Sequence, residues 1–196
     1  MSSIEIDGMV LDDLPLKDAV DLTRELLDRP GLDVVICTTE AAFFRNEISE
    51  EKKNWLESAS LNVFDVAGSE SGSFFGIFRQ HNRNMKAEDY LEFMLKYLQG
   101  TGRNVTLMAE DAEQAKRVKR NILRDYEDIE IDVCILSEAG NGDSMYNELN
   151  VSEPEVIISV LPWRLQEGIL KDARNLLIAS LWLALPSESF KDKRLV

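Results

Sequence analysis

Polar side chains follow two apolar segments of the chain, at places where a strand of a sheet would end. Thr38 and Thr39 follow the apolar segment 32–37, and Asp65 follows the apolar segment 61–64. Ligands of open α/β sheets bind beyond the carboxyl ends of the strands, so these three residues are candidates for substrate contact. Structural roles fit them as well, because Thr39 can cap a helix and Asp65 can accept backbone hydrogen bonds in a turn.

A second group of polar residues follows the apolar segment 156–161. It contains Arg164, Gln166 and Glu167. The long segment 66–84 adds Arg79 and Arg83, and a loop of this length inside a compact domain is more often functional than idle. Arginine is the usual partner of phosphate and carboxylate groups. The alternative is that these residues form a solvated first helix turn and exposed loop positions.

Sequence motifs of well-known cofactor and metal sites are absent. The chain has no GxGxxG, no GxxxxGK[ST], no HExxH, no CxxC, no GxSxG and no Asp-x-Asp, so we predict no cofactor and no metal. His81 is the single histidine and lies in a polar stretch, where we expect a solvated loop residue. A mechanism that depends on histidine is therefore disfavoured.

The composition is that of a folded, strongly acidic protein. The chain has 22 Lys and Arg residues and 36 Asp and Glu residues, so its net charge is −14. This charge disfavours nucleic acid as a partner, and an anionic ligand would have to be bound by cations close to its site. Cys37 and Cys134 lie in apolar runs, as buried reduced thiols do. The amino terminus is not a secretory signal, and the longest apolar stretch, 176–185, is shorter than the ~20 residues of a membrane span. We expect a cytoplasmic protein.

Apolar periodicity alternates along the chain between that of strands and that of helices. The prediction is a single α/β domain over 1–196, Rossmann-like, with a mostly parallel sheet flanked by helices, a loop at 66–84 and a short tail at 186–196. Asp12 or Asp13 is expected to cap the first helix. The expected strands are 4–6, 32–38, 61–65, 104–108, 129–136, 155–160 and 176–183, and the expected helices are 16–28, 40–44, 49–58, 87–98, 110–126, 145–149 and a turn or helix at 164–170.

The order and spacing of these pieces resemble the WecG/TagA/CpsF glycosyltransferases (glycosyltransferase family 26). Segments 33–40, 55–65 and 153–167 carry the resemblance, which runs over nearly the whole chain. It implies transfer of an N-acetylhexosamine, N-acetylmannosamine-like, from a UDP donor to a polyprenyl-diphosphate-linked sugar, with inversion and without bound metal, in the synthesis of cell-surface polysaccharide. It also implies contact with the inner face of the membrane.

The resemblance assigns roles to individual residues. It places the catalytic general base on Asp65 and the diphosphate-binding arginine of the loop on Arg83. Substrate-binding positions then include the family's Gln-Glu pair, and the full set is Thr38, Thr39, Arg83, Arg164, Gln166 and Glu167. These residue types fit the reaction, because an acceptor hydroxyl needs a base and a departing UDP needs fixed positive charge.

Differences from the family pattern lead to an alternative function. Val66 replaces a glycine after the catalytic aspartate, and the segment 109–112 replaces glycines that would approach the ligand with their backbone. Phe74, Phe75 and Phe78 stand in the long loop. The alternative is a catalytically degenerate family member that acts as a binding or regulatory partner, and a different ligand in the same cleft is a third hypothesis. The sequence leaves open whether the protein forms a homo-oligomer.

Overall fold

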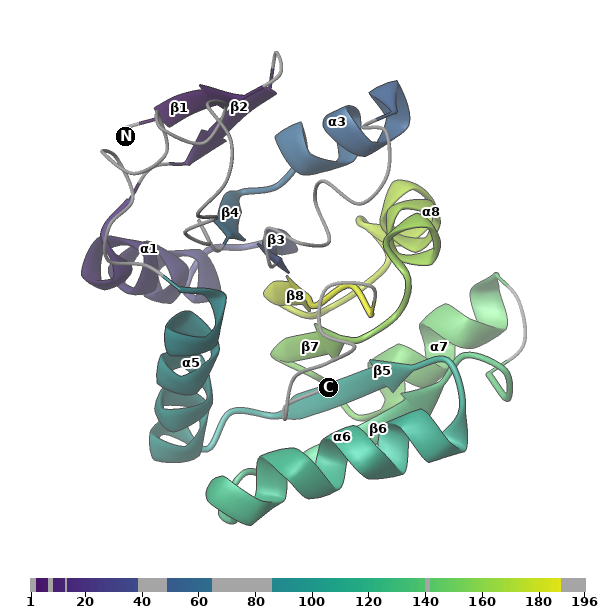
Figure 1. Ribbon diagram of the computed structural model, residues 1–196. Coiled ribbons are helices and arrows are strands. Elements are labelled where there is room, and N and C mark those ends of the chain that lie inside the picture. Colours follow the sequence, from purple (N-terminus) through teal and green to yellow (C-terminus); the bar gives the residue numbers. More distant parts are fainter. Residues whose placement is uncertain are drawn as a thin grey trace.

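Six parallel strands form the central sheet of the protein in a computed structural model, which describes residues 3–6, 9–12, 14–38, 49–64, 86–139 and 142–187. Their order across the sheet is β4-β3-β8-β7-β5-β6 (Figure 1). The strands are β3 (Asp33–Thr38), β4 (Leu61–Phe64), β5 (Val105–Ala109), β6 (Ile131–Ile135), β7 (Val156–Ser159) and β8 (Leu181–Ala184). The predicted α/β class with a parallel sheet is confirmed.

Helices cover both faces of this sheet. One face carries three helices, α1 (Leu16–Leu27), α5 (Ala87–Thr101) and α6 (Ala112–Asp125). The other face carries α3 (Glu50–Glu57), α7 (Asp143–Val151) and α8 (Trp163–Ala173). The result is a three-layer α/β/α arrangement, which Figure 1 shows with the sheet in the middle. In the part of the chain that is described, no helix is long and apolar enough to cross a membrane.

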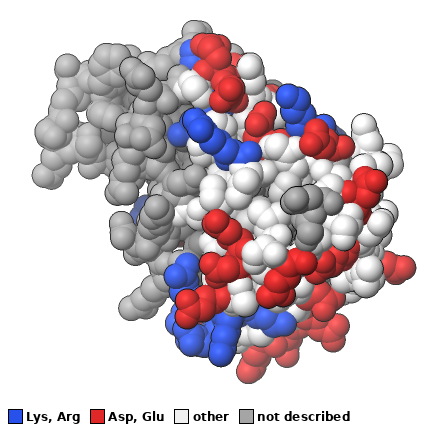
Figure 2. Space-filling model, turned by 90° about the vertical axis from the view of Figure 1, so that its right-hand side faces the viewer, with Lys and Arg blue, Asp and Glu red and all other residues white. Residues whose placement is uncertain are grey.

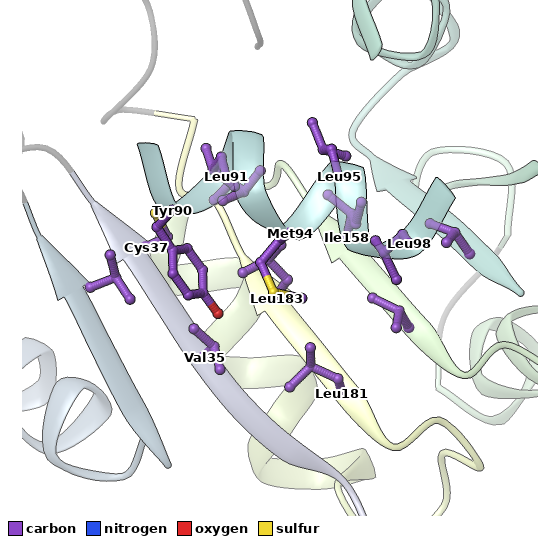
Figure 3. Close-up of a cluster of buried hydrophobic side chains, with 14 of the residues drawn as sticks. Val35, Cys37, Tyr90, Leu91, Met94, Leu95, Leu98, Ile158, Leu181 and Leu183 are labelled. Carbon is purple, nitrogen blue, oxygen red and sulfur yellow. The ribbon is translucent and has the colours of Figure 1, made fainter. Parts of the chain in front are cut away.

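Alternation along each strand divides the interior into two cores. On β3, Val35 and Cys37 pack under α1 and α5, whereas Val34 and Ile36 pack on the side of α3 and α8. Thr38 has the same parity as Val34 and Ile36, since successive side chains point to opposite faces of a sheet. The first core is seen in Figure 3, where α5 lies across β3, β8 and β7.

A buried polar contact joins two helices in the first core. Tyr90 on α5 and Thr23 on α1 share a hydrogen bond of 2.8 Å between their hydroxyl oxygens, and both residues are fully buried. Thr23 also donates to the carbonyl of Ala19, one turn earlier in α1. Tyr90 therefore buries its phenol group with its polar atom satisfied.

The amino-terminal region differs from the prediction. A hairpin of β1 (Ser3–Ile6) and β2 (Met9–Asp12) precedes α1, where only one strand was expected. The prediction that Asp12 caps α1 is wrong, because its carboxylate accepts the backbone N–H of Asn62 on β4 at 2.9 Å and the helix begins after Pro15 without a side-chain cap. The hairpin thus covers the β4 edge of the sheet.

The last strand also begins later than predicted. β8 starts at Leu181, whereas the apolar stretch starts at Leu176. Leu176 and Ile178 are more than half exposed, and the Asn150 side chain holds this segment by bonding to the carbonyl of Leu176 and the N–H of Ile178. The predicted helix 40–44, the loop 66–84 and residues 188–196 of the predicted tail lie outside the described residues.

Candidate functional site

Helix α8 begins at the carboxyl edge of the sheet, directly after β7. Pro162 is its N-cap residue, and the first turn contains no acidic residue and no side-chain cap. The N–H groups of Leu165 and Gln166 both turn back to the carbonyl of Pro162. The positive end of this helix dipole therefore faces the edge of the sheet without a carboxylate in the first turn to neutralise it.

Two cations and two indole rings meet at the start of α8. The Arg164 guanidinium carbon lies 5.5 Å from the centre of the Trp163 ring, and the Lys52 ammonium lies 6.0 Å from it. Trp55 and Trp163 have ring centres 5.9 Å apart at an angle of 39°. These distances are in the range of cation–π and tilted aromatic contacts. We call Lys52, Trp55, Trp163 and Arg164 the tryptophan–cation cluster.

Unmet polar atoms lie on the same side of the sheet as this cluster. Trp55 is 3% exposed and Ser159 is fully buried, and among the described residues neither the Trp55 indole N–H nor the Ser159 hydroxyl has a hydrogen-bond partner. Ser159 is the last residue of β7, and its neighbours Ile158 and Val160 pack into the opposite core, so it faces α8. A buried polar atom without a hydrogen-bond partner costs about 1–3 kcal/mol of stability. Two such atoms on one side of the sheet are therefore unusual and mark this region as a candidate site.

The predicted site residues occupy different environments. Thr38 is the last residue of β3 and is 5% exposed, Arg164 is exposed and Glu167 is half-buried. Gln166 is fully buried: its amide nitrogen donates to the Leu161 carbonyl at 2.7 Å, and its oxygen accepts the Trp182 indole N–H at 3.0 Å. Five of the residues considered from the sequence lie outside the described part of the chain, namely Thr39, Asp65, Arg79, His81 and Arg83.

The structure brings α3 and α8 together, although these helices follow different strands. Thr38 pairs in register with Phe64, the residue that precedes Asp65. The start of α8 follows β7, which is separated from β3 by β8. The contact of Trp55 with Trp163 bridges this separation, so Arg164 shares a cluster with a lysine from the helix that follows β3. A ligand along this edge could meet residues from both sides.

Four residues of this region were not predicted to be site residues from the sequence, namely Lys52, Trp55, Ser159 and Trp163. Lys52 and Trp55 are three residues apart, as members of one helix face are, which is also the pattern of ordinary packing residues. Ser159 is the one polar residue in the apolar run 156–161. This interruption is the signal that could have drawn attention to it.

Other parts of the described structure lack the features of a reactive site. A pocket between α5, α6 and the sheet has only aliphatic lining, namely Leu91, Leu95, Val118, Ile122, Ile158, Leu183 and Leu185. Several of these side chains are labelled in Figure 3. No group of three or more His, Cys, Asp or Glu side chains in the described residues could hold a metal ion. Burial raises the pKa of the Cys134 thiol to about 11, with a smaller contribution from Glu148.

No family model matches this chain, and no curated protein matches it.

Proposed function

We propose that this protein is a metal-independent inverting glycosyltransferase that moves an N-acetylhexosamine, N-acetylmannosamine-like, from a UDP donor to a polyprenyl-diphosphate-linked sugar at the inner face of the membrane. One observation carries the proposal. Arg164 and Lys52 converge on Trp163 at the carboxyl edge of a parallel sheet, where the first turn of α8 has no acidic residue. In a chain of net charge −14, this cluster is a local source of positive charge for a diphosphate.

The reaction needs a base and a stabilised leaving group. In the proposed step, Asp65 accepts the proton of the acceptor hydroxyl as its oxygen forms a bond to the anomeric carbon of the donor. The bond between that carbon and the phosphate oxygen breaks, and UDP leaves with the electron pair. Fixed positive charge at the departing diphosphate lowers the barrier most when it is positioned in advance, as the packed ring of Trp163 would do for Arg164.

Binding of the donor can be tested without the acceptor. We expect UDP and UDP-N-acetylhexosamines at millimolar concentration to raise the melting temperature, because a ligand that binds only the folded state stabilises it. Arg164→Gln should weaken this effect about tenfold in apparent affinity. Arg124→Gln is the matched control, since Arg124 is an exposed arginine on α6 that pairs with its neighbour Asp125. Absence of any stabilisation by UDP compounds would remove the proposal.

Catalysis is tested by turnover. With a lipid-linked acceptor, we expect transfer by the unchanged protein and loss of transfer in Asp65→Asn with donor binding retained. This pattern separates a base from a binding residue. Equal transfer by both proteins would contradict the role of Asp65.

A second candidate function is a catalytically degenerate binding or regulatory partner, and the start of α6 favours it. Asp111 accepts the N–H of Gln114, and the Gln114 side chain accepts the N–H of Glu110. Two backbone N–H groups that could meet a phosphate after β5 are thus bonded to side chains, and one of these side chains is a carboxylate. Donor binding without measurable transfer would support this candidate over the enzyme.

A further inference from the structure

Strand β6 forms an edge of the sheet in the described part of the chain, with β5 as its neighbour on one side and no described strand on the other. Ala109 of β5 pairs in register with Ile135, and its carbonyl accepts the N–H of Leu136. Because the hydrogen-bonding groups of successive residues in a strand point in opposite directions, the even-numbered residues of β6 bond to β5. Ile131, Val133 and Ile135 therefore direct their N–H and carbonyl groups to the open edge.

Some of the outward-facing backbone groups of β6 have hydrogen-bond partners within the protein, but those at the centre of the strand have none among the described residues. The Lys119 ammonium donates to the carbonyl of Ile131, and the N–H groups of Glu138 and Ala139 donate to the carbonyl of Ile135. Val133 is 36% exposed, and its backbone groups have no partner outside the β5 ladder in the described residues. The opposite edge differs, because the hairpin β1–β2 lies against β4. An incoming strand would thus pair at Val133.

A flank of basic side chains borders the same edge. Lys116, Lys119 and Arg120 have the spacing of one helix face on α6, and the bond of Lys119 to Ile131 shows that this face adjoins β6. Lys116 and Arg120 are exposed and form no ion pair within the described residues. Figure 2 shows basic side chains gathered at the lower left, at the height of α6 in Figure 1.

The two faces of β6 have different chemistry. Ile131 and Ile135 pack into the core under α6, so Val133, which has the same parity, also lies on the α6 side. Cys134 packs into the other core, so the exposed Asp132 lies on the α7 side, away from the basic flank. An added strand would place alternate side chains beside Lys116 and Arg120.

We propose that the β6 edge binds an extended, acidic segment of a partner protein by strand addition. The segment pairs its backbone with Val133, and its acidic side chains on the α6 side meet Lys116, Lys119 and Arg120. A second copy of this chain fits less well, because a twofold pairing of two β6 strands would bring two basic α6 flanks together. The proposal is independent of the glycosyltransferase function.

The test uses the whole protein and two short labelled peptides in fluorescence anisotropy. One peptide alternates Thr and Glu, and the control alternates Thr and Lys. We expect binding of the Thr–Glu peptide only, with affinity that falls as salt is added. Lys116→Glu should weaken binding about tenfold. Lys171→Glu is the matched control, because Lys171 is an exposed lysine in the last turn of α8 on the other face of the sheet.

A backbone variant tests strand addition itself. Val133→Pro removes an N–H that bonds no neighbour, and proline is tolerated on edge strands, so we expect the fold to persist and peptide binding to be lost. Circular dichroism and thermal melting verify the fold of each variant. Should Val133→Pro unfold the protein, the pair Lys116→Glu and Lys171→Glu still decides. Equal binding of both peptides, equal affinities of the two lysine variants, or a dimer in sedimentation that Val133→Pro dissociates would overturn the proposal.

Discussion

Gln166 on α8 holds the indole ring of Trp182 on β8. The Trp182 N–H donates to the Gln166 amide oxygen at 3.0 Å, and both residues are fully buried. The Gln166 nitrogen donates in turn to the carbonyl of Leu161, in the turn between β7 and α8. One amide therefore ties the start of α8 to strand β8 and to the turn that follows β7.

Replacement of Gln166 should destabilise the fold. Gln166→Leu leaves the Trp182 N–H buried without its partner, whereas the Leu161 carbonyl keeps its bond from the N–H of Ser187 at 3.2 Å. We therefore expect a loss of about 2 kcal/mol in the free energy of unfolding. Urea denaturation measures this loss. Glu167→Gln is the control at the adjacent, half-buried position, with an expected change within about 0.5 kcal/mol. Unchanged stability in Gln166→Leu would show that these hydrogen bonds contribute nothing to the free energy of unfolding.

The hydroxyl pair of Tyr90 and Thr23 should contribute a measurable coupling between α5 and α1. Tyr90→Phe removes the 2.8 Å bond, yet Thr23 keeps its bond to the Ala19 carbonyl, so we expect a loss of about 1 kcal/mol. Thr23→Val removes both bonds and should cost more. In the double variant, the effect of Tyr90→Phe should shrink, which a double-mutant cycle by denaturant unfolding detects. Strict additivity of the two changes would show that the pair contributes no coupling.

The helices and most strands follow from local sequence patterns. The apolar stripe of 87–98 predicts α5 because its members face one core. The helix ends three residues later than predicted, at Thr101, and is capped by Gly102, whose φ of 64° is in the left-handed region that glycine favours. The hairpin could not be found in this way. Asp12 looks like a helix cap, and its actual partner, Asn62, is 50 residues away along the chain. Contacts of this kind depend on how the elements are assembled.

The candidate site was predicted only in part for a similar reason. Thr38 and Arg164 are predicted site residues because they follow apolar strand segments, and the structure places both at the carboxyl edge of the sheet. Gln166 has the sequence of a solvated first turn, and its burial is decided by Trp182, which comes 16 residues later. The cluster of Lys52 with Trp163 joins two helices that are far apart in sequence. No local pattern contains that contact.

The raised pKa of Cys134 predicts a loss of stability in alkaline solution. Burial raises the pKa of this thiol from 9.0 to about 11, so between these values the folded protein keeps a proton that the unfolded chain has lost. The contribution is complete below pH 9 and declines as the pH rises through the folded value, by at most about 3 kcal/mol.

Cys134→Ala isolates this contribution from the other groups that titrate in alkaline solution. The variant loses packing at every pH but has no thiol to ionise, so its stability deficit relative to the unchanged protein should shrink between about pH 8 and about pH 10.5. Urea unfolding at the two pH values measures the deficit. Glu148→Gln should reduce the loss of stability that ionisation of Cys134 causes in alkaline solution, because the Glu148 carboxylate also raises the pKa of the thiol. A deficit that stays constant with pH would show that the thiol ionises equally well in the folded and unfolded chains.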